Sequence, residues 1–370
     1  MKKILFCISF LFALFADAQP SPQRLQFKLD SLRAAGNYPG LSISIMDGDD
    51  KTVSLVCGFS DMEKQVPLST KHMLMQGSVG KTYVAAIAIM LIKNGRLDLD
   101  EKVSAYLGRY AWYSRIPNAS SITVRQIMNH TSGVMRYEFK PDFVNDLIAM
   151  PAKEWKPEEL LKYVLDEKAS FAAGEGWEYS DTNFILLGMI IEHLTGKKYY
   201  ELLFEKILEP YQLANTKPTD RHLLPGIAQG YAGKDNPFKL PEKVIKDDGS
   251  FVINPQFEWT GGGLYSTTED LAKWGKLLYE GKVIDTSLLI GEAVPAKLGR
   301  DAKYGLGIII RPTPKGIAYG HSGFFPGYLT ELYYFPGRKL CIALQANSSD
   351  MKNLKIGTQR ILLEMANEYN

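Results

Sequence analysis

The sequence has few of the residues that metal sites and disulfide scaffolds require. It contains three cysteines and five histidines in 370 residues, and no Cys/His spacing resembles a zinc site. The formal net charge is only +2 at pH 7. Because there is also no cluster of Lys or Arg, a surface that binds nucleic acid is excluded.

Long apolar runs are also missing beyond the N-terminus, so no membrane-spanning helix is expected in the rest of the chain. At the N-terminus, Lys2 and Lys3 precede the apolar run Ile4–Phe15, and Ala16-Asp17-Ala18 has the small-x-small form that signal peptidase accepts. We expect residues 1–18 to be a secretory signal and the mature protein to be periplasmic or secreted, without stable membrane insertion. A buried N-terminal helix or an uncleaved anchor is the alternative.

Two cysteines, Cys57 and Cys341, remain after the expected cleavage. Export would permit a disulfide between them. Both lie in apolar, strand-like runs, where two buried free thiols are an equally good interpretation. The sequence therefore leaves their pairing open.

Strand-like periodicity occurs at both ends of the chain, and helical periodicity dominates the middle. Strands are predicted at 41–46, 52–57, 306–310, 317–320, 328–334 and 340–345, and helices at 20–35, 79–94, 124–129, 157–168, 182–195, 199–208, 268–279 and 354–369. This pattern predicts an α/β (α+β) fold with one antiparallel sheet, built from N- and C-terminal strands and flanked by helices. We expect residues 19–370 to form a single domain with an all-helical lobe at about 96–260 and a cleft between the lobes.

Ser78 and Lys81 lie at the start of the apolar helix predicted over 79–94, three residues apart and therefore on one face. A helix N-terminus stabilises the negative charge of a serine that passes through an oxyanion, and a lysine amine can act as its base if burial lowers the pKa. Alone, the pattern also fits a helix-capping serine with a solvated lysine. A phosphate-binding loop is excluded because Met75 stands where that motif needs glycine.

Tyr179 and Asp181 come just before the helix predicted over 182–195. A tyrosine on such a turn can point its phenol into a cleft. Beside a cationic lysine its pKa would fall, which would make it a proton carrier. The alternative is that Asp181 caps the helix and Tyr179 only packs.

The segment His321-Ser322-Gly323 follows the short strand predicted over 317–320. A small residue such as Gly323 on an edge strand allows a substrate backbone to approach and pair with it. The next N–H, on Phe324, could form an oxyanion hole with the N–H of Ser78. Alone, the segment fits a simple turn equally well.

The order of these three motifs, at 78–81, 179–181 and 321–323, is more specific than any one of them. In this order the chain resembles the family of class C β-lactamases, low-molecular-weight DD-peptidases and related esterases. That family carries S-x-x-K at a helix start, Y-x-N on a loop, and K-T-G or H-T-G on a strand. Further segments that are similar to the family's sequence are Asn129–Gly133, Tyr179–Phe184 and Gly261–Thr267. The resemblance extends from about residue 24 to the C-terminus.

The resemblance implies a β-lactamase/transpeptidase-like fold and an acyl-enzyme mechanism. Ser78 would attack a carbonyl with help from Lys81 and Tyr179, and the oxyanion would rest on the N–H groups of Ser78 and Phe324. Water would then release the acyl group, with no metal or cofactor. The implied partner is a small peptide, ester or β-lactam substrate, and the oligomeric state stays open. His130 is expected to be structural.

Two positions depart from the family's motifs. Asp181 stands where the family often has asparagine, and its carboxylate should hold Lys81 protonated. This favours Tyr179 as the base, with Lys81 keeping it ionised, although the sequence does not decide between the two. His321 stands where true β-lactamases have lysine, and a neutral histidine attracts a substrate carboxylate less. The bulky Phe324 also makes that wall more apolar.

These departures favour hydrolysis of amides or esters over hydrolysis of antibiotics. We expect an exported serine hydrolase that is DD-peptidase-like or a D-amino-acid peptidase. A carboxylesterase is the alternative within the family, followed by a class C-like β-lactamase. From a different class, an inactive binder of cell-wall peptides is disfavoured because Ser78, Lys81 and Tyr179 are all intact.

Overall fold

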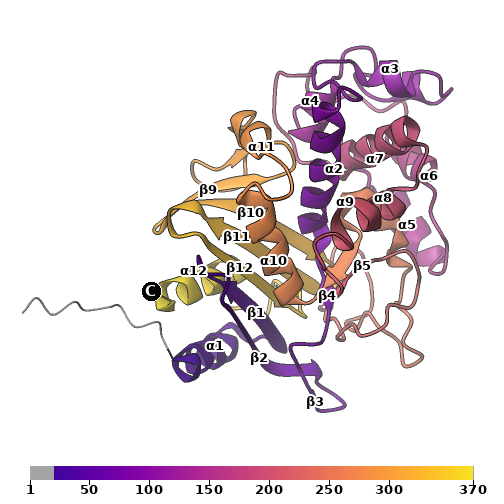
Figure 1. Cartoon of the computed structure of the whole chain (residues 1–370). Helices are drawn as coiled ribbons and strands as arrows, with labels where there is room; N and C mark the ends of the chain where they lie inside the picture. Colours follow the sequence, from indigo (N-terminus) through magenta and orange to yellow (C-terminus); the bar gives the residue numbers. More distant parts are fainter. Residues whose placement is uncertain (1–20, 370) are drawn as a thin grey trace, which may run out of the picture.

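Strands from both ends of the chain form one nine-stranded antiparallel sheet (Figure 1). The structure, a computed structural model, describes residues 21–369, so the expected signal at 1–18 lies outside the described residues. In spatial order the strands are β3 (Val66–Pro67), β2 (Thr52–Asp61), β1 (Gly40–Met46), β12 (Leu340–Ala346), β11 (Tyr328–Phe335), β10 (Gly316–Phe325), β9 (Ile309–Thr313), β8 (Lys303–Tyr304) and β7 (Val294–Pro295). The predicted fold class and the origin of the sheet are confirmed.

The two faces of the sheet follow from the alternation of residues in β1. Its apolar side chains, such as Ile43, belong to the core beneath α1 and α12. The alternate residues Ser42 and Ser44 face the opposite side. Their hydroxyls lie 2.9 and 2.8 Å from the Thr268 hydroxyl of α10. One strand thus supplies an apolar layer to one face and a hydrogen-bonded attachment for a helix to the other.

Helices cover both faces of the sheet (Figure 1). Helices α1 and α12 pack on one face, and α10 packs on the other. The covering helices are α1 (Pro22–Gly36), α12 (Thr358–Glu368) and α10 (Thr268–Tyr279), and the short helix α11 (Ser287–Gly291) lies nearby.

The middle of the chain forms a helical lobe beside the sheet (Figure 1). It contains α2 (Lys81–Lys93), α3 (Val103–Leu107), α4 (Val124–Met128), α5 (Pro141–Ala149), α6 (Pro157–Leu161), α7 (Asp181–Thr195), α8 (Tyr199–Leu203) and α9 (Trp259–Gly262). A small sheet of β4 (Leu74–Met75), β6 (Leu264–Ser266) and β5 (Thr216–Pro218), which the sequence pattern did not predict, lies at its edge.

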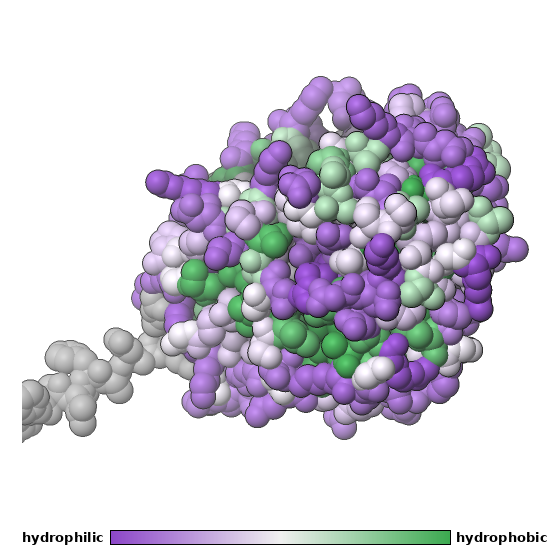
Figure 2. Space-filling model, turned by 90° about the horizontal axis from the view of Figure 1, so that it is seen from above, coloured by the Kyte–Doolittle hydropathy of each residue, from purple (hydrophilic) through white to green (hydrophobic). Residues whose placement is uncertain are grey.

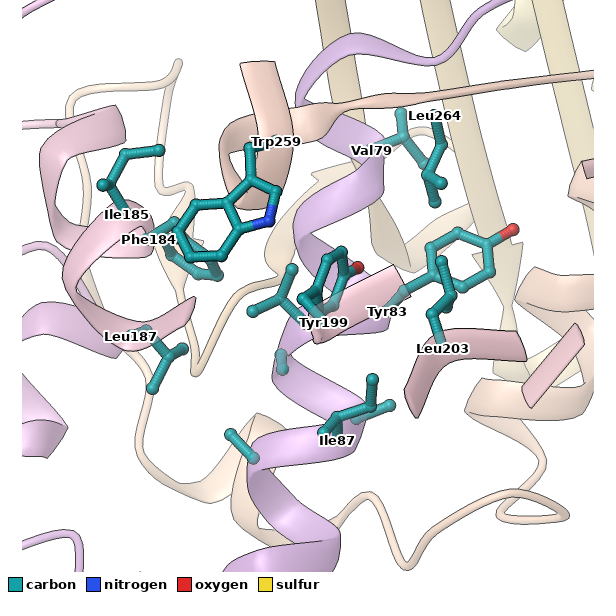
Figure 3. Close-up of a cluster of buried hydrophobic side chains, with 14 of the residues drawn as sticks. Val79, Tyr83, Ile87, Phe184, Ile185, Leu187, Tyr199, Leu203, Trp259 and Leu264 are labelled. Carbon is teal, nitrogen blue, oxygen red and sulfur yellow. The ribbon is translucent and has the colours of Figure 1, made fainter. Parts of the chain in front are cut away.

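Helix α2 is buried on nearly every side, as its apolar sequence predicts. Figure 3 shows Tyr83 and Ile87 of α2 packed among side chains of α7, α8 and α9. On its other side, the Tyr83 ring stacks on Trp274 of α10 with centroids 4.0 Å apart. Each fully buried side chain of this size stabilises the fold by about 1.5–3 kcal/mol. The start of α2 is therefore held firmly in place.

Several predicted boundaries differ from the structure. The chain before α2 is a 3-10 turn, η1 (Gly77–Gly80), so the α-helix begins at Lys81 and not at Val79. Strand β10 continues through Phe325, so the turn considered for 321–323 is wrong. β10 is an interior strand, but it pairs with β9 only as far as Gly320. Its residues from 321 to 325 therefore have no partner strand on the β9 side.

The two cysteines are free and lie on different faces of the sheet. Cys57 of β2 packs in the core beneath α1 and α12, whereas Cys341 of β12 packs in the core on the α10 side. The sheet therefore separates the thiols, which settles the pairing that the sequence left open.

The face of the molecule that Figure 2 shows is mainly hydrophilic. Seen from above, its apolar residues gather in separate patches between hydrophilic ones (Figure 2). None of the helices in residues 21–369 has the length and apolar character needed to cross a membrane.

Candidate active site

Ser78 lies in the turn η1 and Lys81 is the first residue of α2, so the backbone places their side chains together. The Lys81 Nζ donates to the Ser78 Oγ at 3.1 Å. Lys81 is completely buried. A serine hydroxyl at the edge of a cleft thus contacts an amine that solvent does not reach.

Lys81 has two further oxygen partners. Its Nζ forms an ion pair with the Asp181 Oδ1 at 2.5 Å and donates to the carbonyl oxygen of Gly261. Asp181 opens α7 and Gly261 lies in α9, so the amine joins three elements of the helical lobe. A buried ammonium is costly unless an opposite charge and hydrogen-bond acceptors surround it. Asp181 supplies the opposite charge and the Gly261 carbonyl oxygen supplies an acceptor. Asp181 itself does not line the cleft.

Tyr179 is also brought to this place, with its ring centroid 5.0 Å from the Lys81 Nζ. Burial, and then the carboxylate of Asp181, raise the pKa of the phenol well above its usual range. The Ser78 hydroxyl beside it acts in the opposite direction, although the two hydroxyls form no regular hydrogen bond. The predicted fall in the Tyr179 pKa is therefore wrong: burial and then the carboxylate of Asp181 outweigh the Ser78 hydroxyl and Arg136, and the phenol is neutral.

Two buried carboxyl groups near Asp181 were not expected from the sequence. Glu138 pairs with Arg136 at 2.6 Å, and burial followed by the charge of Asp181 raises its pKa to about 7. Burial, and again Asp181, raise the pKa of Glu258 to about 8. The helical wall of the site thus has more acidic groups than its two cations, Lys81 and Arg136, can neutralise. At neutral pH, part of this acid is protonated.

His130 holds the turn that carries Tyr179. Its carbonyl oxygen accepts from the Glu178 N–H (3.1 Å), and its Nδ1 accepts from the Ser180 N–H (3.3 Å) and lies 3.1 Å from the Asn183 Nδ2. The ring packs against the ring of Tyr179, with centroids 4.3 Å apart. These contacts agree with the structural role expected for His130.

On the strand wall, His321 is buried as a neutral ring. Its Nδ1 lies 2.6 Å from the Ser322 carbonyl oxygen and donates to it, so its Nε2 accepts from the Tyr304 hydroxyl at 2.9 Å. Burial, and then the charge of Lys81, lower the pKa of His321 to about 3. His321 therefore brings no positive charge to the cleft at neutral pH. Tyr304, which the sequence did not single out, occupies the Nε2 of His321.

Ser322 points to the other face of the sheet. Its Oγ donates to the Glu331 Oε2 at 2.6 Å and accepts from the Arg311 Nη2 at 3.1 Å. Arg311 forms no ion pair with any of the residues that the structure describes. The hydroxyl expected to bind substrate is thus committed to neighbours on β9 and β11.

Gly323 and Gly77 let the strand and the nucleophile turn approach closely. A Cβ on Gly323 would lie 1.9 Å from the Gln76 carbonyl oxygen, and a Cβ on Gly77 (φ 51°) would lie 2.7 Å from the Phe324 nitrogen. Only glycine fits at either position. The backbone of Phe324 therefore lies close against the turn that carries Ser78, where the resemblance implies an oxyanion hole.

A cleft of about 460 Å³ opens beside these groups. Of the residues expected in the site, it is lined by Ser78, Tyr179, His321, Ser322, Gly323 and Phe324. Lys81 and Asp181 lie behind Ser78. The arrangement can support nucleophilic attack by Ser78, with proton transfer through the buried groups behind it. Within residues 21–369, no three His, Cys, Asp or Glu side chains are grouped as metal ligands.

This fold and site define a serine hydrolase with an S-x-x-K nucleophile. The profile of the Beta-lactamase family matches residues 26–365, and the chain belongs to that family.

Curated relatives cover most of the chain. It is 26% identical over 346 residues to Penicillin-binding protein 4* of Bacillus subtilis (strain 168), covering 90% of this chain and 73% of that protein. It is 24% identical over 332 residues to a teichoic acid D-alanine hydrolase of Staphylococcus aureus (strain NCTC 8325 / PS 47), covering 89% and 75%. The family and these relatives identify a serine hydrolase that acts on amides or esters.

Solved structures agree in fold. A D-amino acid amidase from Ochrobactrum anthropi SV3 superposes with a TM-score of 0.80 at 23% identity, covering 94% of this chain and 98% of that one. A D-stereospecific amidohydrolase from a Streptomyces species gives 0.79 at 24% identity, covering 93% and 98%. The predicted β-lactamase/transpeptidase-like fold is confirmed.

Proposed function

We propose that this chain is an exported serine hydrolase that cleaves amide bonds of D-amino-acid derivatives through an acyl-enzyme on Ser78, with residues 19–370 as one catalytic domain. The observation that carries the proposal is the contact between the Ser78 Oγ and the buried Lys81 Nζ at 3.1 Å, at the edge of the cleft. An inactive peptide binder has no physical need for a buried lysine at this place.

The contact between Lys81 and Ser78 indicates how Ser78 loses its proton. A deprotonated Lys81 amine, 3.1 Å from the Ser78 Oγ, accepts the serine proton, and the carboxylate of Asp181 beside it stabilises the ammonium that results. The neutral phenol of Tyr179 suits the next step, which is donation of a proton to the leaving group. The oxyanion meanwhile rests on the N–H groups of Ser78 and Phe324. Water then releases the acyl group by the reverse sequence.

The His321 ring on the strand wall favours amide substrates without a strong negative charge over β-lactams, which carry a carboxylate. The neutral ring of His321, with its Nε2 occupied by Tyr304, attracts a carboxylate less than the lysine of a true β-lactamase would. Relatives named as a D-alanine hydrolase and a D-amino acid amidase agree with this substrate class. The neutral His321 ring also favours a second candidate function, a carboxylesterase that acts on small acyl esters.

The test is the intact mass of the mature protein after incubation with a fluorophosphonate, with benzylpenicillin, and with D-amino-acid amides. We expect a phosphonyl adduct on the parent and none on Ser78→Ala, with D-amino-acid amides consumed only by the parent. A penicillin adduct that persists would indicate a peptidase-like site that deacylates slowly. A parent that takes up no phosphonate and consumes no amide or ester would refute the proposal.

A further inference from the structure

A loop outside the regular helices and strands is fixed by its own hydrogen bonds. The buried Asn236 donates from its Nδ2 to the Leu240 carbonyl oxygen (2.7 Å), and its Oδ1 accepts from the Leu240 N–H (3.0 Å). At the base of the loop, the Ala232 N–H donates to the Glu242 carbonyl oxygen at 2.7 Å. Because both tip and base are held, the side chain of Phe238 between them is held as well.

Phe238 is only 3% exposed and contacts an aromatic ring on each side. It stacks on Phe324 of β10, with centroids 6.3 Å apart and planes 21° apart, and lies 5.3 Å from the ring of Phe139. The Arg136 guanidinium lies 4.2 Å from the centroid of Phe139 and 5.8 Å from that of Tyr179. These contacts form a continuous chain from the strand wall to the Tyr179 wall. We call its members, Phe324, Phe238, Phe139 and Arg136, the aromatic arch.

The arch makes the cleft one-ended. Two of its members, Phe324 and Arg136, line the cleft next to Ser78. The rest of the lining beyond the motif residues lies toward β9, β11 and the start of α12, and includes Leu298, Arg311, Leu329, Leu354 and Thr358. The cleft therefore extends from Ser78 toward α12, and Phe324 and Arg136 bound it at the other end.

A closed end and an open end suit different parts of the substrate. As the bond between the Ser78 Oγ and the acyl carbon forms, the bond from that carbon to the leaving nitrogen or oxygen breaks. The leaving group takes up a proton and departs as an amine or alcohol, while the acyl group stays on Ser78 until water releases it as the acid. Only the open limb offers the leaving group an exit.

We propose that the aromatic arch restricts the acyl group to a small one, such as an acetyl or D-alanyl group, and that a larger amine or alcohol leaving group lies in the open limb toward α12. This inference rests on the proposed function, because it assigns the two ends of a substrate that acylates Ser78. Phe238 and Phe139 do not line the cleft; they are positioning residues that hold Phe324 and Arg136 against it.

The test compares the parent with Phe238→Ala and Phe139→Ala. The matched control is Phe27→Ala, the same change on a ring of α1 that is 75% exposed. Values of kcat/KM are measured for p-nitrophenyl acetate, butyrate and octanoate, and for D-alanine and D-phenylalanine p-nitroanilides. A second series varies the alcohol of acetate esters from methanol to naphthol.

In the parent we expect kcat/KM to fall at least about tenfold from acetyl to octanoyl, and to fall little as the alcohol grows. Both arch variants should reduce the acyl-length effect at least about fivefold, and Phe27→Ala should leave it unchanged. Phe139→Ala keeps the test decisive if the buried Phe238 is needed for folding. Equal rates for acetyl and octanoyl esters in the parent, or unchanged ratios in folded arch variants, would overturn the inference and leave the hydrolase intact. A parent without any turnover or phosphonate uptake would overturn the proposed function too.

Discussion

On the helical wall of the cleft, Lys81 is buried as one half of an ion pair with Asp181 at 2.5 Å. On the strand wall, His321 is buried as a neutral ring that accepts a hydrogen bond from Tyr304 at 2.9 Å. The first wall keeps a pair of opposite charges beside Ser78, and each partner depends on the other for its burial. On the second wall, the His321 ring adds no charge to the cleft and stays neutral over the neutral pH range. The two walls therefore bury their polar groups in different ways, one as an ion pair and the other as a neutral hydrogen-bonded pair.

The largest effect should come from breaking the ion pair of the helical wall. Asp181→Ala leaves the Lys81 ammonium buried without its counter-charge, so we expect the free energy of unfolding to fall by about 3–5 kcal/mol. Acylation by a fluorophosphonate should slow by about 10²–10⁴-fold, because the ammonium that Lys81 forms on accepting the serine proton loses its counter-charge. Chemical denaturation and the rate of adduct formation measure the two effects.

The matched control is Asp166→Ala, which removes an ion pair to Arg115 that is also 2.5 Å long but lies on the surface. An exposed pair of this kind contributes at most about 1 kcal/mol. If Asp181→Ala costs no more than Asp166→Ala, the helical wall does not work as described.

A smaller effect should appear as a pH dependence of the same wall. Glu258 has a pKa raised to about 8, above the ordinary value of the unfolded chain, so the folded state holds a proton that the unfolded state releases. Stability is therefore fully present below the unfolded pKa and declines as pH rises toward 8. Between pH 6 and 8, we expect the parent to lose about 2 kcal/mol more than Glu258→Gln.

Denaturant unfolding at a series of pH values measures this difference. Glu159→Gln is a suitable control, because Glu159 is half-buried and its pKa is lowered by the Lys156 N–H and by Lys153. Parallel stability curves for the parent and Glu258→Gln would contradict the account of the acidic wall.

The smallest effect should come from the strand wall, where no charge is lost. Tyr304→Phe removes the donor to the His321 Nε2 and leaves a buried acceptor unpaired, which costs about 1 kcal/mol of stability. Tyr319→Phe on β10 is the control, because that hydroxyl bonds no other residue in the described part of the chain. Thermal unfolding compares the two, and equal stabilities would show that the Tyr304–His321 pair contributes nothing.

The secondary structure and much of the candidate site could be predicted from the sequence wherever a short local pattern determines the structure. The alternation in β1 and the apolar sequence of α2 fix those elements by burial alone. The spacing of Ser78 and Lys81 places them on one face of a turn. The order of the motifs, through the resemblance to a known family, predicted that Tyr179 and Asp181 lie beside them. These inferences need only short-range geometry or a resemblance in motif order.

The rest depends on contacts between distant segments. The run Gly320–Gly323 is typical of a turn, but pairing with β11 extends it as strand. Tyr304 meets His321 only because β8, β9 and β10 adopt one register. The rise in the Tyr179 pKa reflects how deeply the phenol is buried and how near Asp181 lies, and no motif carries this information.

The pairing of β1 with β12 also has a consequence for how the chain comes to be folded. Residues 41–46 take 341–346 as direct neighbours, so a central seam of the sheet joins the two ends of the sequence. During synthesis the early hairpin β1–β2 must wait, with one edge unpaired, until nearly the whole chain has been made. Non-local pairing of this kind is slow, and a chain that must wait is available to a translocation or chaperone machinery that accepts unfolded proteins.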